Sequence, residues 1–405
     1  MRILSFGHIP TWAGGRQESG LANVIYQLAK HGSDQDGAEV TLVATDCFVP
    51  VRKDGKLTIL GWTKSSLIGY MLVHPLSAAR SFFKLYGLKK KYPICESMAG
   101  LYLKRILFEK SVRRVNPQVI HLHGVQAIWN LDLVPKSTKV AVTFHGMTGK
   151  DKNLNDNEIL FNMERDLFLS KRVNEVFFIC TQLVDSFKDS YGENGKNNIV
   201  IFNSYDNTQF YLETDKQTPT RLDKEDGERS CVTTLCTVAS LSDRKGQMRV
   251  LSALSTLPDR KRFEYICIGG GTNEMAEKVN LFAKEHDIVF RYLGKMKPDS
   301  IRKHLYMADY MIMPSSSEGF GLTYLEAIAC GVPVIMPRDI PIAHEKTLIN
   351  EKNSILLEDS TDKSIAKVLG RINDYCFNSK EVAASIAGYT WNQIASQYFE
   401  SFKKL

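Results

Sequence analysis

The chain has 405 residues, of which 43% are hydrophobic and 24% are charged. This composition is that of an ordinary folded protein and excludes a disordered chain. No apolar run approaches the roughly 18 residues of a membrane span. The length is more than one hydrophobic core usually organises, so we expect two domains.

The eight cysteines are scattered along the chain without a C-x-x-C pair. Several of them stand in apolar, strand-like runs, which is typical of small buried thiols. This usage favours a reducing compartment over disulfides or a zinc site. The start of the chain resembles a first buried strand rather than a secretion signal. We therefore expect a cytoplasmic protein.

The first half of the chain alternates apolar runs with amphipathic segments. The runs MRILSFG and AEVTLVATD flank the helical pattern LANVIYQLAKHG. Four more apolar runs follow at 119–124, 139–146, 175–181 and 198–203. Strands that alternate with helices build a parallel sheet, so we predict a doubly wound α/β domain.

A basic segment interrupts this half between residues 62 and 114. It contains eleven Lys and Arg against two Glu, while the whole chain has a net charge of +7. Aromatic side chains stand among the cations, which favours peripheral contact with an anionic membrane or with an anionic acceptor. Two alternatives stay open: apolar core residues with a solvated basic face, or a site for an acidic polymer.

Residues 211–230 are polar and lack a hydrophobic period, so we predict a domain boundary or an exposed loop beside one. After them the strand and helix rhythm restarts, from CVTTLCTVASL to VPVIMP. Two doubly wound halves that face each other would place a cleft at the carboxyl ends of both sheets, where such folds bind ligands.

The stretch SSSEGFGLTYLEAIACGVPVI, residues 315–335, predicts a helix from about Leu322 that stops at Gly331. A helix N-terminus offers free N–H groups to a phosphate, here those of Gly319, Phe320, Gly321, Leu322 and Thr323. Glu318 and Glu326 would repel a phosphate but suit hydroxyl groups as acceptors. A nucleotide sugar meets both demands. The alternative is that both acids merely complement the helix dipole.

The motif EGFGLTYLEAIACGVPVI resembles the E-x7-E signature of retaining glycosyltransferases of GT-B fold, glycosyltransferase family 4, also called glycosyl transferases group 1. The resemblance implies two Rossmann-like domains facing a central cleft: an acceptor-binding domain at 1–205 and a donor-binding domain at 206–388. A final helix, 389–405, would return to the first domain. It also implies that Glu318 contacts hydroxyls of the donor sugar and that Glu326 holds the ribose diol.

The segment TVASLSDRKGQ is similar to the family's lysine-glycine motif, which implies that Lys245 binds the donor diphosphate. Where the family usually has Gly-Arg, this chain has Ala239 and Ser240. Arg244 is a candidate substitute, with a surface arginine as the alternative. His145 matches the histidine that approaches the donor sugar.

Further positions follow from the same resemblance. Leu293 and Gly294 stand where relatives place the nucleotide base, and the glycine-rich loop of residues 12–20 would line the cleft. Gly15 is our candidate for donor contact there, with Gly14 and Gly20 as competing registers. The run CIGGG at 267–271 is either a cleft segment or a simple strand-to-helix turn, and His121 and His123 are interpreted as structural.

These residues predict a retaining transferase that moves a sugar from a nucleotide-diphosphate sugar to a glycan or lipid-linked acceptor. The resemblance implies a role in bacterial cell-surface polysaccharide synthesis, as lipopolysaccharide, O-antigen or capsule. A UDP-sugar is favoured, and a GDP-sugar stays open. Lys245 and the helix N-terminus would offset charge on the leaving group, so neither a metal nor another cofactor is expected. The enzyme would work in the cytoplasm. A peripheral position at the inner face of the cytoplasmic membrane stays open.

Other functional classes are kept as alternatives. A nucleotide-sugar epimerase of similar fold or a noncatalytic nucleotide-sugar binder would share the architecture. A nicotinamide oxidoreductase is disfavoured because no G-x-G-x-x-G follows the first strand. We expect no nucleic-acid partner.

Overall fold

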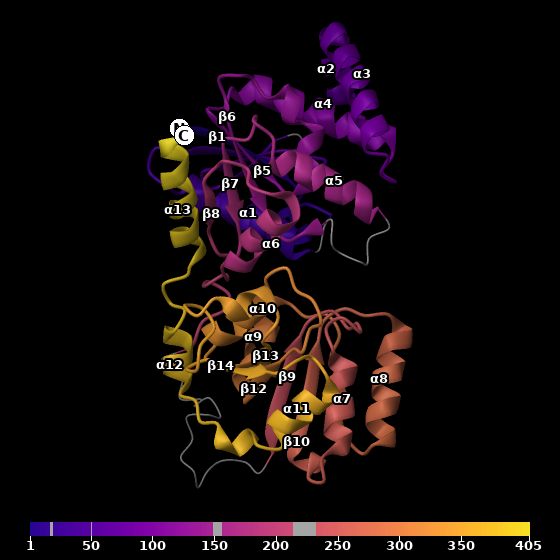
Figure 1. The fold of residues 1–405 in the computed structure, drawn as a ribbon, viewed down its shortest axis with the longest axis vertical. Coiled ribbons are helices and arrows are strands. Elements are labelled where there is room, and N and C mark those ends of the chain that lie inside the picture. The colour runs from indigo at the N-terminus through magenta and orange to yellow at the C-terminus, as the bar shows by residue number, and fades with distance from the viewer. Residues whose placement is uncertain (17–18, 50, 149–155, 214–231) are drawn as a thin grey trace. The chain divides into compact units, whose positions relative to one another are not determined.

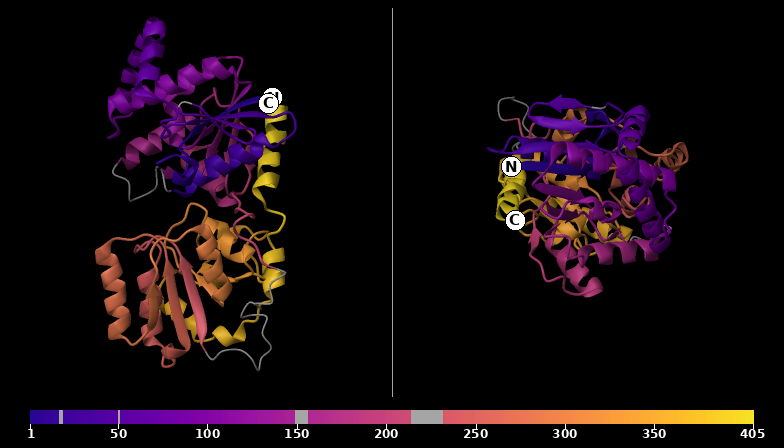
Figure 2. Two further views of the ribbon diagram at one scale, coloured as in Figure 1. Left: turned by 180° about the vertical axis from the view of Figure 1, so that it is seen from behind. Right: turned by 90° about the horizontal axis from the view of Figure 1, so that it is seen from above.

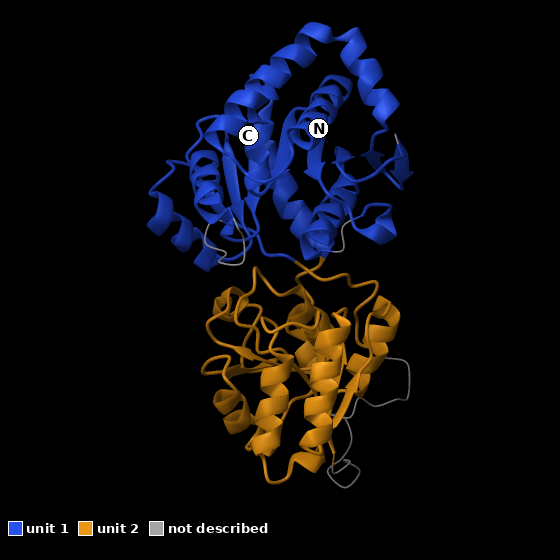
Figure 3. Ribbon diagram, turned by 90° about the vertical axis from the view of Figure 1, so that its right-hand side faces the viewer, with its two compact units in different colours: residues 1–203, 391–405 blue, residues 204–390 orange. Residues whose placement is uncertain are grey.

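The computed structural model describes residues 1–16, 19–49, 51–148, 156–213 and 232–405. They form two compact units, coloured separately in Figure 3. Unit 1 comprises Met1–Asn203 and Trp391–Leu405, and unit 2 comprises Ser204–Thr390. Most of the predicted loop or boundary at 211–230 lies outside the described residues.

Unit 1 is built on an eight-stranded sheet in the order β3-β4-β2-β1-β5-β6-β7-β8 (Figure 1). Its strands are β1 (Arg2–Gly7), β2 (Glu39–Ala44), β3 (Arg52–Asp54), β4 (Leu57–Leu60), β5 (Val119–His123), β6 (Lys139–Phe144), β7 (Glu175–Phe178) and β8 (Asn198–Val200). All neighbours pair in parallel except β3 with β4. The central strands are buried on both faces, which explains their continuous apolar runs.

The helices of unit 1 connect the strands of the sheet, except for the last one. They are α1 (Gly20–Ser33), α2 (Lys64–Val73), α3 (Pro75–Lys91), α4 (Met98–Val115), α5 (Asn157–Phe168), α6 (Thr181–Tyr191) and α13 (Trp391–Lys404). Helices α2, α3 and α4 follow one another between β4 and β5. Ser19 begins α1 as its N-cap by accepting a hydrogen bond from the backbone of Ala22. The last helix, α13, packs against α1 and buries Trp391 and Tyr398.

Helices α2 and α3 extend away from the sheet of unit 1, as the two opposite views show (Figures 1 and 2). They pack on each other and on α4. Pro75 opens α3 directly after His74, which ends α2, so the chain turns sharply between the two helices. No helix among the described ranges is both long and apolar enough to cross a membrane.

Unit 2 contains a six-stranded sheet in the order β11-β10-β9-β12-β13-β14, with every pair parallel. Its strands are β9 (Thr233–Val238), β10 (Phe263–Ile268), β11 (Val289–Tyr292), β12 (Tyr310–Ile312), β13 (Val334–Pro337) and β14 (Ser354–Leu357). From β9 the strand order runs outward through β10 to β11, and on the other side from β12 to β14. The switch point therefore lies between β9 and β12.

The helices of unit 2 are α7 (Gln247–Thr256), α8 (Asn273–Glu285), α9 (Pro298–Met307), α10 (Leu322–Ala329), α11 (Asp362–Leu369) and α12 (Ser379–Ala384). Helix α7 packs with α8 and α11, while α10 packs with α12. The predicted fold class, α/β with two doubly wound sheets, is confirmed. Helix α10 begins at Leu322, where the sequence places its start.

Candidate active site

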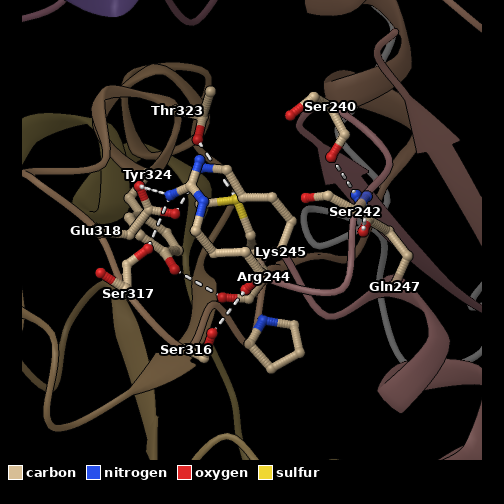
Figure 4. A network of polar contacts seen from close by, with 12 residues as sticks. Ser240, Ser242, Arg244, Lys245, Gln247, Ser316, Ser317, Glu318, Thr323 and Tyr324 are labelled. Carbon is tan, nitrogen blue, oxygen red and sulfur yellow. Dashed lines mark hydrogen bonds and ion pairs between the residues drawn. The ribbon is translucent and has the colours of Figure 1, made fainter. Parts of the chain in front are cut away.

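Two loops meet at the switch point of the unit 2 sheet, and the candidate site is built on them. The loop after β9 carries Lys245, and the loop after β12 carries Glu318 (Figure 4). Lys245 Nζ lies 2.5 Å from Glu318 Oε1. The side chains are only 13% and 7% exposed, respectively. A cation and a carboxylate that are far apart in sequence are thus joined where open α/β sheets bind ligands.

Arg244 lies on the other side of the same carboxylate. Its Nη1 donates to the backbone oxygen of Ser317 at 2.9 Å and lies 3.7 Å from Glu318 Oε2. The backbone N–H of Ser316 donates to Arg244 O at 2.9 Å, which ties the two loops together. Arg244 and Lys245 therefore both face Glu318, and Arg244, at 44% exposure, is the more open to solvent.

The loop after β9 is held by residues that the sequence did not single out. Gly246 has φ of 83°, and a Cβ there would lie 2.6 Å from Pro314 O. Arg249 donates to Pro314 O at 2.7 Å and to Asp243 O at 2.8 Å. Gln247 donates to the backbone oxygen of Ser240 at 3.0 Å. Only glycine combines that φ with so close an approach to the second loop.

Helix α10 starts directly after this second loop. Gly321 is its N-cap, with φ of 92°, and Phe320 before it is buried. Tyr324 donates from its hydroxyl to Met313 O at 2.6 Å, which fixes the first turn against the end of β12. The first N–H groups of an α-helix have no partner within the helix, so this end of α10 is suited to an anion. The predicted set Gly319, Phe320, Gly321, Leu322 and Thr323 surrounds that end.

Glu326 lies one turn into α10. No hydrogen bond or ion pair of its carboxylate occurs within the part of the chain that the structure describes. Burial, together with the negative charge of Asp206, raises the pKa of Glu326 to about 7. A carboxyl that has no partner and a raised pKa is typical of a site that binds a hydrogen-bonding ligand.

The strand ends beside this site are closely packed. Leu293 N donates to Cys267 O and Gly269 N donates to Gly294 O, so the ends of β10 and β11 are joined. Gly269 has φ of 148°, and a Cβ there would lie 1.9 Å from Ala239 O. The end of β10 therefore lies between the loop that holds Leu293 and Gly294 and the loop after β9. The CIGGG run connects β10 to α8, and its Gly269 lies close to the end of β9.

His145 belongs to unit 1, at the end of β6. Its Nε2 lies 3.0 Å from His123 Nδ1, and the two rings are stacked. Its Nδ1 is buried, and the structure shows no hydrogen-bond partner for it among the described residues. Burial lowers the pKa of His145 to about 3, so the imidazole is neutral at physiological pH. His121, in the same cluster, bonds to Thr143 at 2.7 Å.

The glycine-rich loop also belongs to unit 1. Asp46 accepts hydrogen bonds from the backbone of Ile9 at 3.1 Å and of Arg16 at 2.9 Å, which closes the loop. A Cβ on Gly15 would lie 1.9 Å from Ile9 O, whereas Gly14 has φ of 88° and Gly20 begins α1. Residues 17 and 18 of this loop lie outside the described residues.

The predicted residues fall into two groups. Unit 2 brings together Lys245, Arg244, Glu318 and the start of α10, with Glu326 on α10 itself. Leu293 and Gly294 follow β11 in the same unit. Unit 1 holds His145 and Gly15. Sequence reasoning missed the supporting residues Gly246, Gln247, Arg249 and Tyr324. The lysine-glycine motif, which includes Gly246, was a signal for that glycine. The described residues contain no cluster of His, Cys, Asp or Glu able to hold a metal ion.

Comparison with known proteins gives this geometry a context. The family model for glycosyl transferases group 1 matches residues 220–374, which include both loops of the site. The matched residues all belong to unit 2. N-acetyl-alpha-D-glucosaminyl L-malate synthase of Bacillus anthracis is 26% identical to this chain over 235 residues, or 56% of the chain and 58% of that protein. The chain spans about half the length of the curated relatives it matches.

Solved structures of similar fold cover the whole chain. Sucrose-phosphate synthase of Thermosynechococcus elongatus has a TM-score of 0.74 at 15% identity, covering 100% of this chain and 98% of that one. Anabaena HepE, solved with UDP and glucose, has a TM-score of 0.66 at 14% identity, with 100% of both chains covered. At these identities the likeness shows the fold, and that fold is GT-B.

Proposed function

We propose that the chain is a retaining glycosyltransferase that moves a sugar from a nucleotide-diphosphate sugar to an acceptor. The observation that carries this proposal is the meeting of Lys245 with Glu318 at 2.5 Å, beside the N-terminus of α10. Cations and a helix N-terminus suit the diphosphate, and carboxylates suit the hydroxyls of a sugar and a ribose. The match of residues 220–374 to the family model supports the same reaction class.

The proposed chemistry depends on charge that develops on the leaving group. When the bond between sugar and diphosphate breaks, negative charge grows on the departing phosphate. Lys245, helped by Arg244 and the N-terminus of α10, would stabilise that charge. In the donor-free chain Glu318 neutralises Lys245, so the cation is held in place before the donor arrives. Glu318 would then bond to hydroxyls of the donor sugar.

The nucleoside would be bound by a second group of unit 2 residues. Glu326 would accept from the ribose diol, and the backbone of Leu293 and Gly294 would border the base. From unit 1, the neutral His145 would approach the sugar and Gly15 the donor. A UDP-sugar is the favoured donor, supported by the UDP bound to Anabaena HepE, and a GDP-sugar is the second choice.

The acceptor is proposed to be a glycan or a lipid-linked glycan of a bacterial cell-surface polysaccharide, as the family resemblance implies. Unit 1 would bind it, and residues 206–388 would bind the donor. The reaction would take place in the cytoplasm. The E-x7-E motif supports the proposed donor binding. The exposed surface of α2 and α3 supports the proposed location.

A panel of nucleotide sugars tests the proposal. A true donor binds the folded state and raises the melting temperature by mass action, by several degrees at saturating ligand. The same donor should be hydrolysed slowly to free sugar with the anomeric configuration retained. Interconversion of sugars would instead identify an epimerase, and tight binding without turnover would identify a binding protein. If no nucleotide sugar shifts the melting temperature, the proposal is wrong.

The surface of α2 and α3 favours a membrane-associated location. Large apolar side chains are exposed around the turn between these helices, with Leu72 at 76%, Val73 at 73% and Leu76 at 84%. Phe83 is 70% exposed further along α3. Apolar side chains exposed this close together favour an interaction site. Exposed basic residues accompany it: Lys64, Arg80, Lys84, Lys90 and Lys91.

Flotation with lipid vesicles tests this location. The chain should float with vesicles that contain anionic lipid and less with zwitterionic ones, because cations near the surface add about 1 kcal/mol each. Replacing Leu72 and Leu76 by Asp should abolish flotation without changing donor binding. Leu281, 57% exposed on α8 of unit 2, offers the matched control L281D. Equal flotation with both vesicle types would contradict the proposal.

A further inference from the structure

Unit 1 contains a cavity of about 100 Å³ that the donor chemistry does not use. It lies at the switch point of the unit 1 sheet, because its walls include the ends of β1 and β5, between which the strand order reverses. Helices α1 and α4 and the 3-10 turn η2 (Val125–Trp129) complete the walls. The lining is mostly apolar and includes Phe6, Leu21, Ile25, Leu101, Leu122, Ala127 and Trp129.

One polar side chain in this wall lacks a partner. Asn130 lines the cavity and is only 3% exposed, yet its side-chain oxygen has no hydrogen bond. Its side-chain nitrogen likewise donates to no residue in the described ranges. A buried amide oxygen without a hydrogen bond costs roughly 1–3 kcal/mol, so its presence in an apolar wall indicates a ligand that donates a hydrogen bond to it.

The wall that carries Asn130 is held in place before any ligand binds. Arg105, buried in α4, donates to Asp132 at 2.7 Å and also to the backbone oxygen of Trp129, so it grips the chain on both sides of Asn130. The indole of Trp129 donates to Gln126 at 2.8 Å. Tyr92 packs edge-on against Trp129. Such support lowers the entropy lost on binding, which is typical of a preformed binding site.

The charges around the cavity limit the class of ligand. Lys104 is the one permanently cationic residue among the described lining residues, and its ammonium lies 2.5 Å from Glu96 Oε1. No unpaired lysine or arginine of the lining therefore awaits an anion. His8 lines the same cavity with its Nδ1 3.0 Å from Thr45 Oγ1. A carboxamide offers one acceptor and two donors, which matches hydroxyl groups better than phosphates.

We propose that this cavity is an acceptor subsite that binds one edge of a neutral sugar ring. The carboxamide of Asn130 exchanges hydrogen bonds with ring hydroxyls, and the apolar walls pack against the C–H face of the ring. The cavity is smaller than the roughly 150 Å³ that holds benzene, so it receives an edge of the ring and leaves the remainder outside. The inference rests on the proposed transferase function, whose acceptor it defines as a neutral glycan end.

Ligand-observed NMR with methyl glycosides tests the proposal. Methyl α- and β-glycosides of glucose, galactose, mannose and N-acetylglucosamine are offered to the full chain at millimolar concentrations, with and without saturating UDP. At least one should show saturation transfer from the protein. Asn130→Leu should weaken that glycoside about tenfold, since one to two hydrogen bonds are lost. The same variant should leave UDP affinity unchanged.

A stability measurement distinguishes a ligand site from a merely structural asparagine. Because Asn130→Leu removes an unsatisfied polar group from an apolar wall, the variant should melt at the same or a higher temperature than the parent chain. Asn162→Leu on α5, whose amide already bonds to Glu158 O at 3.0 Å, is the matched control and should not change glycoside binding. The proposal is overturned if no glycoside binds to the parent chain. It is also overturned if a glycoside binds to Asn130→Leu and Asn162→Leu with equal affinity.

The two proposals fail in different ways. A chain that binds a nucleotide sugar but no glycoside contradicts the acceptor subsite alone, and the cavity then holds only water. A chain that binds a glycoside through Asn130 but no nucleotide sugar supports the subsite and contradicts the transferase. A drop in the melting temperature of Asn130→Leu would show that the asparagine supports the fold, and this would also overturn the subsite.

Discussion

Lys245 and Glu318 form an ion pair that is largely shielded from solvent, so their mutual attraction is stronger than that of a surface pair. Lys245→Ala should lower turnover by about two orders of magnitude, because a charge-assisted contact to the leaving phosphate is lost. It should also lower the melting temperature, since Glu318 is left without its closest partner. Steady-state kinetics on the donor identified by the panel, with a thermal melt, measure both effects.

A lysine that is far from the site provides the control. Lys261 pairs with Asp287 in unit 2, and both side chains are well exposed. Lys261→Ala should leave turnover and melting temperature almost unchanged, as exposed pairs contribute little. Near-normal turnover of folded Lys245→Ala would remove Lys245 from the catalytic group.

Glu326 carries the pH dependence of the site. Its pKa in the folded chain, raised to about 7 by burial and by Asp206, lies above the usual value of a glutamate. Below the unfolded pKa both states are protonated and nothing is gained or lost. As pH rises from the unfolded pKa to about 7, the unfolded carboxyl ionises while the folded one stays protonated, so the folded state loses stability over that range. Glu326→Gln should therefore raise the free energy of unfolding at pH 8 by about 1–3 kcal/mol and leave it unchanged at pH 4.

The same substitution should weaken nucleotide binding. If the ionised carboxylate accepts from the ribose diol, affinity for the nucleotide sugar should rise as pH increases from 6 to 8, by up to about tenfold. Calorimetric titration of the parent chain and of Glu326→Gln measures this, and the variant should bind weakly at every pH. Equal affinity of the two proteins for the nucleotide sugar would contradict the ribose role.

At the scale of elements, Gly246 joins the loop after β9 to the loop after β12. Gly246→Ala would force a Cβ toward Pro314 O and strain the backbone, which has φ of 83°. We expect the free energy of unfolding to fall by about 1–3 kcal/mol. Because Lys245 precedes this glycine, donor affinity should fall as well. Denaturant unfolding and a donor titration measure the two effects.

Gly388 supplies the matched control for that substitution. It lies in the same unit, its φ is not positive, and a Cβ there would meet nothing within 4 Å. Gly388→Ala should leave donor affinity unchanged and should be neutral or slightly stabilising. Equal effects of the two alanines would show that Gly246 is not a special position.

The elements show which parts of the molecule are readable from sequence. Buried parallel strands and amphipathic helices can be predicted from their hydrophobic pattern. The predicted α/β class and the predicted start of α10 at Leu322 are confirmed. The pairing of Lys245 with Glu318 is not readable in the same way. It depends on β9 and β12 being neighbours in the sheet, which is a tertiary fact. The bracing by Arg249 and Tyr324 was missed for the same reason.

Asn130 marks another limit of sequence reasoning. An asparagine after an apolar run reads as a turn residue. The structure shows instead that its carboxamide is buried in the wall of a cavity. Helix α4 packs against β1 there, and Arg105 of α4 donates to Asp132, two residues after Asn130. Family motifs locate residues that bind the common part of the substrate, the nucleotide, whereas acceptor specificity depends on side chains that no motif marks.

At the scale of the whole molecule, the chain leaves unit 1 after Asn203 and returns at Trp391, so unit 2 is continuous in sequence and unit 1 is not. Unit 2 has its own sheet and its own buried core, as independently folding domains do. Residues 204–390 produced alone should therefore fold cooperatively. Residues 1–203 alone lack α13, which packs on α1, and should be much less stable.

The fragment 204–390 also tests where the donor is bound. Lys245, Glu318, Glu326, Leu293 and Gly294 all belong to unit 2. If they supply most of the affinity for the nucleotide, the isolated unit should bind UDP within roughly an order of magnitude of the full chain. Calorimetric titration measures this, with circular dichroism to establish folding and the fragment that carries Glu326→Gln as the control. A folded fragment that does not bind UDP would place the main nucleotide contacts outside unit 2.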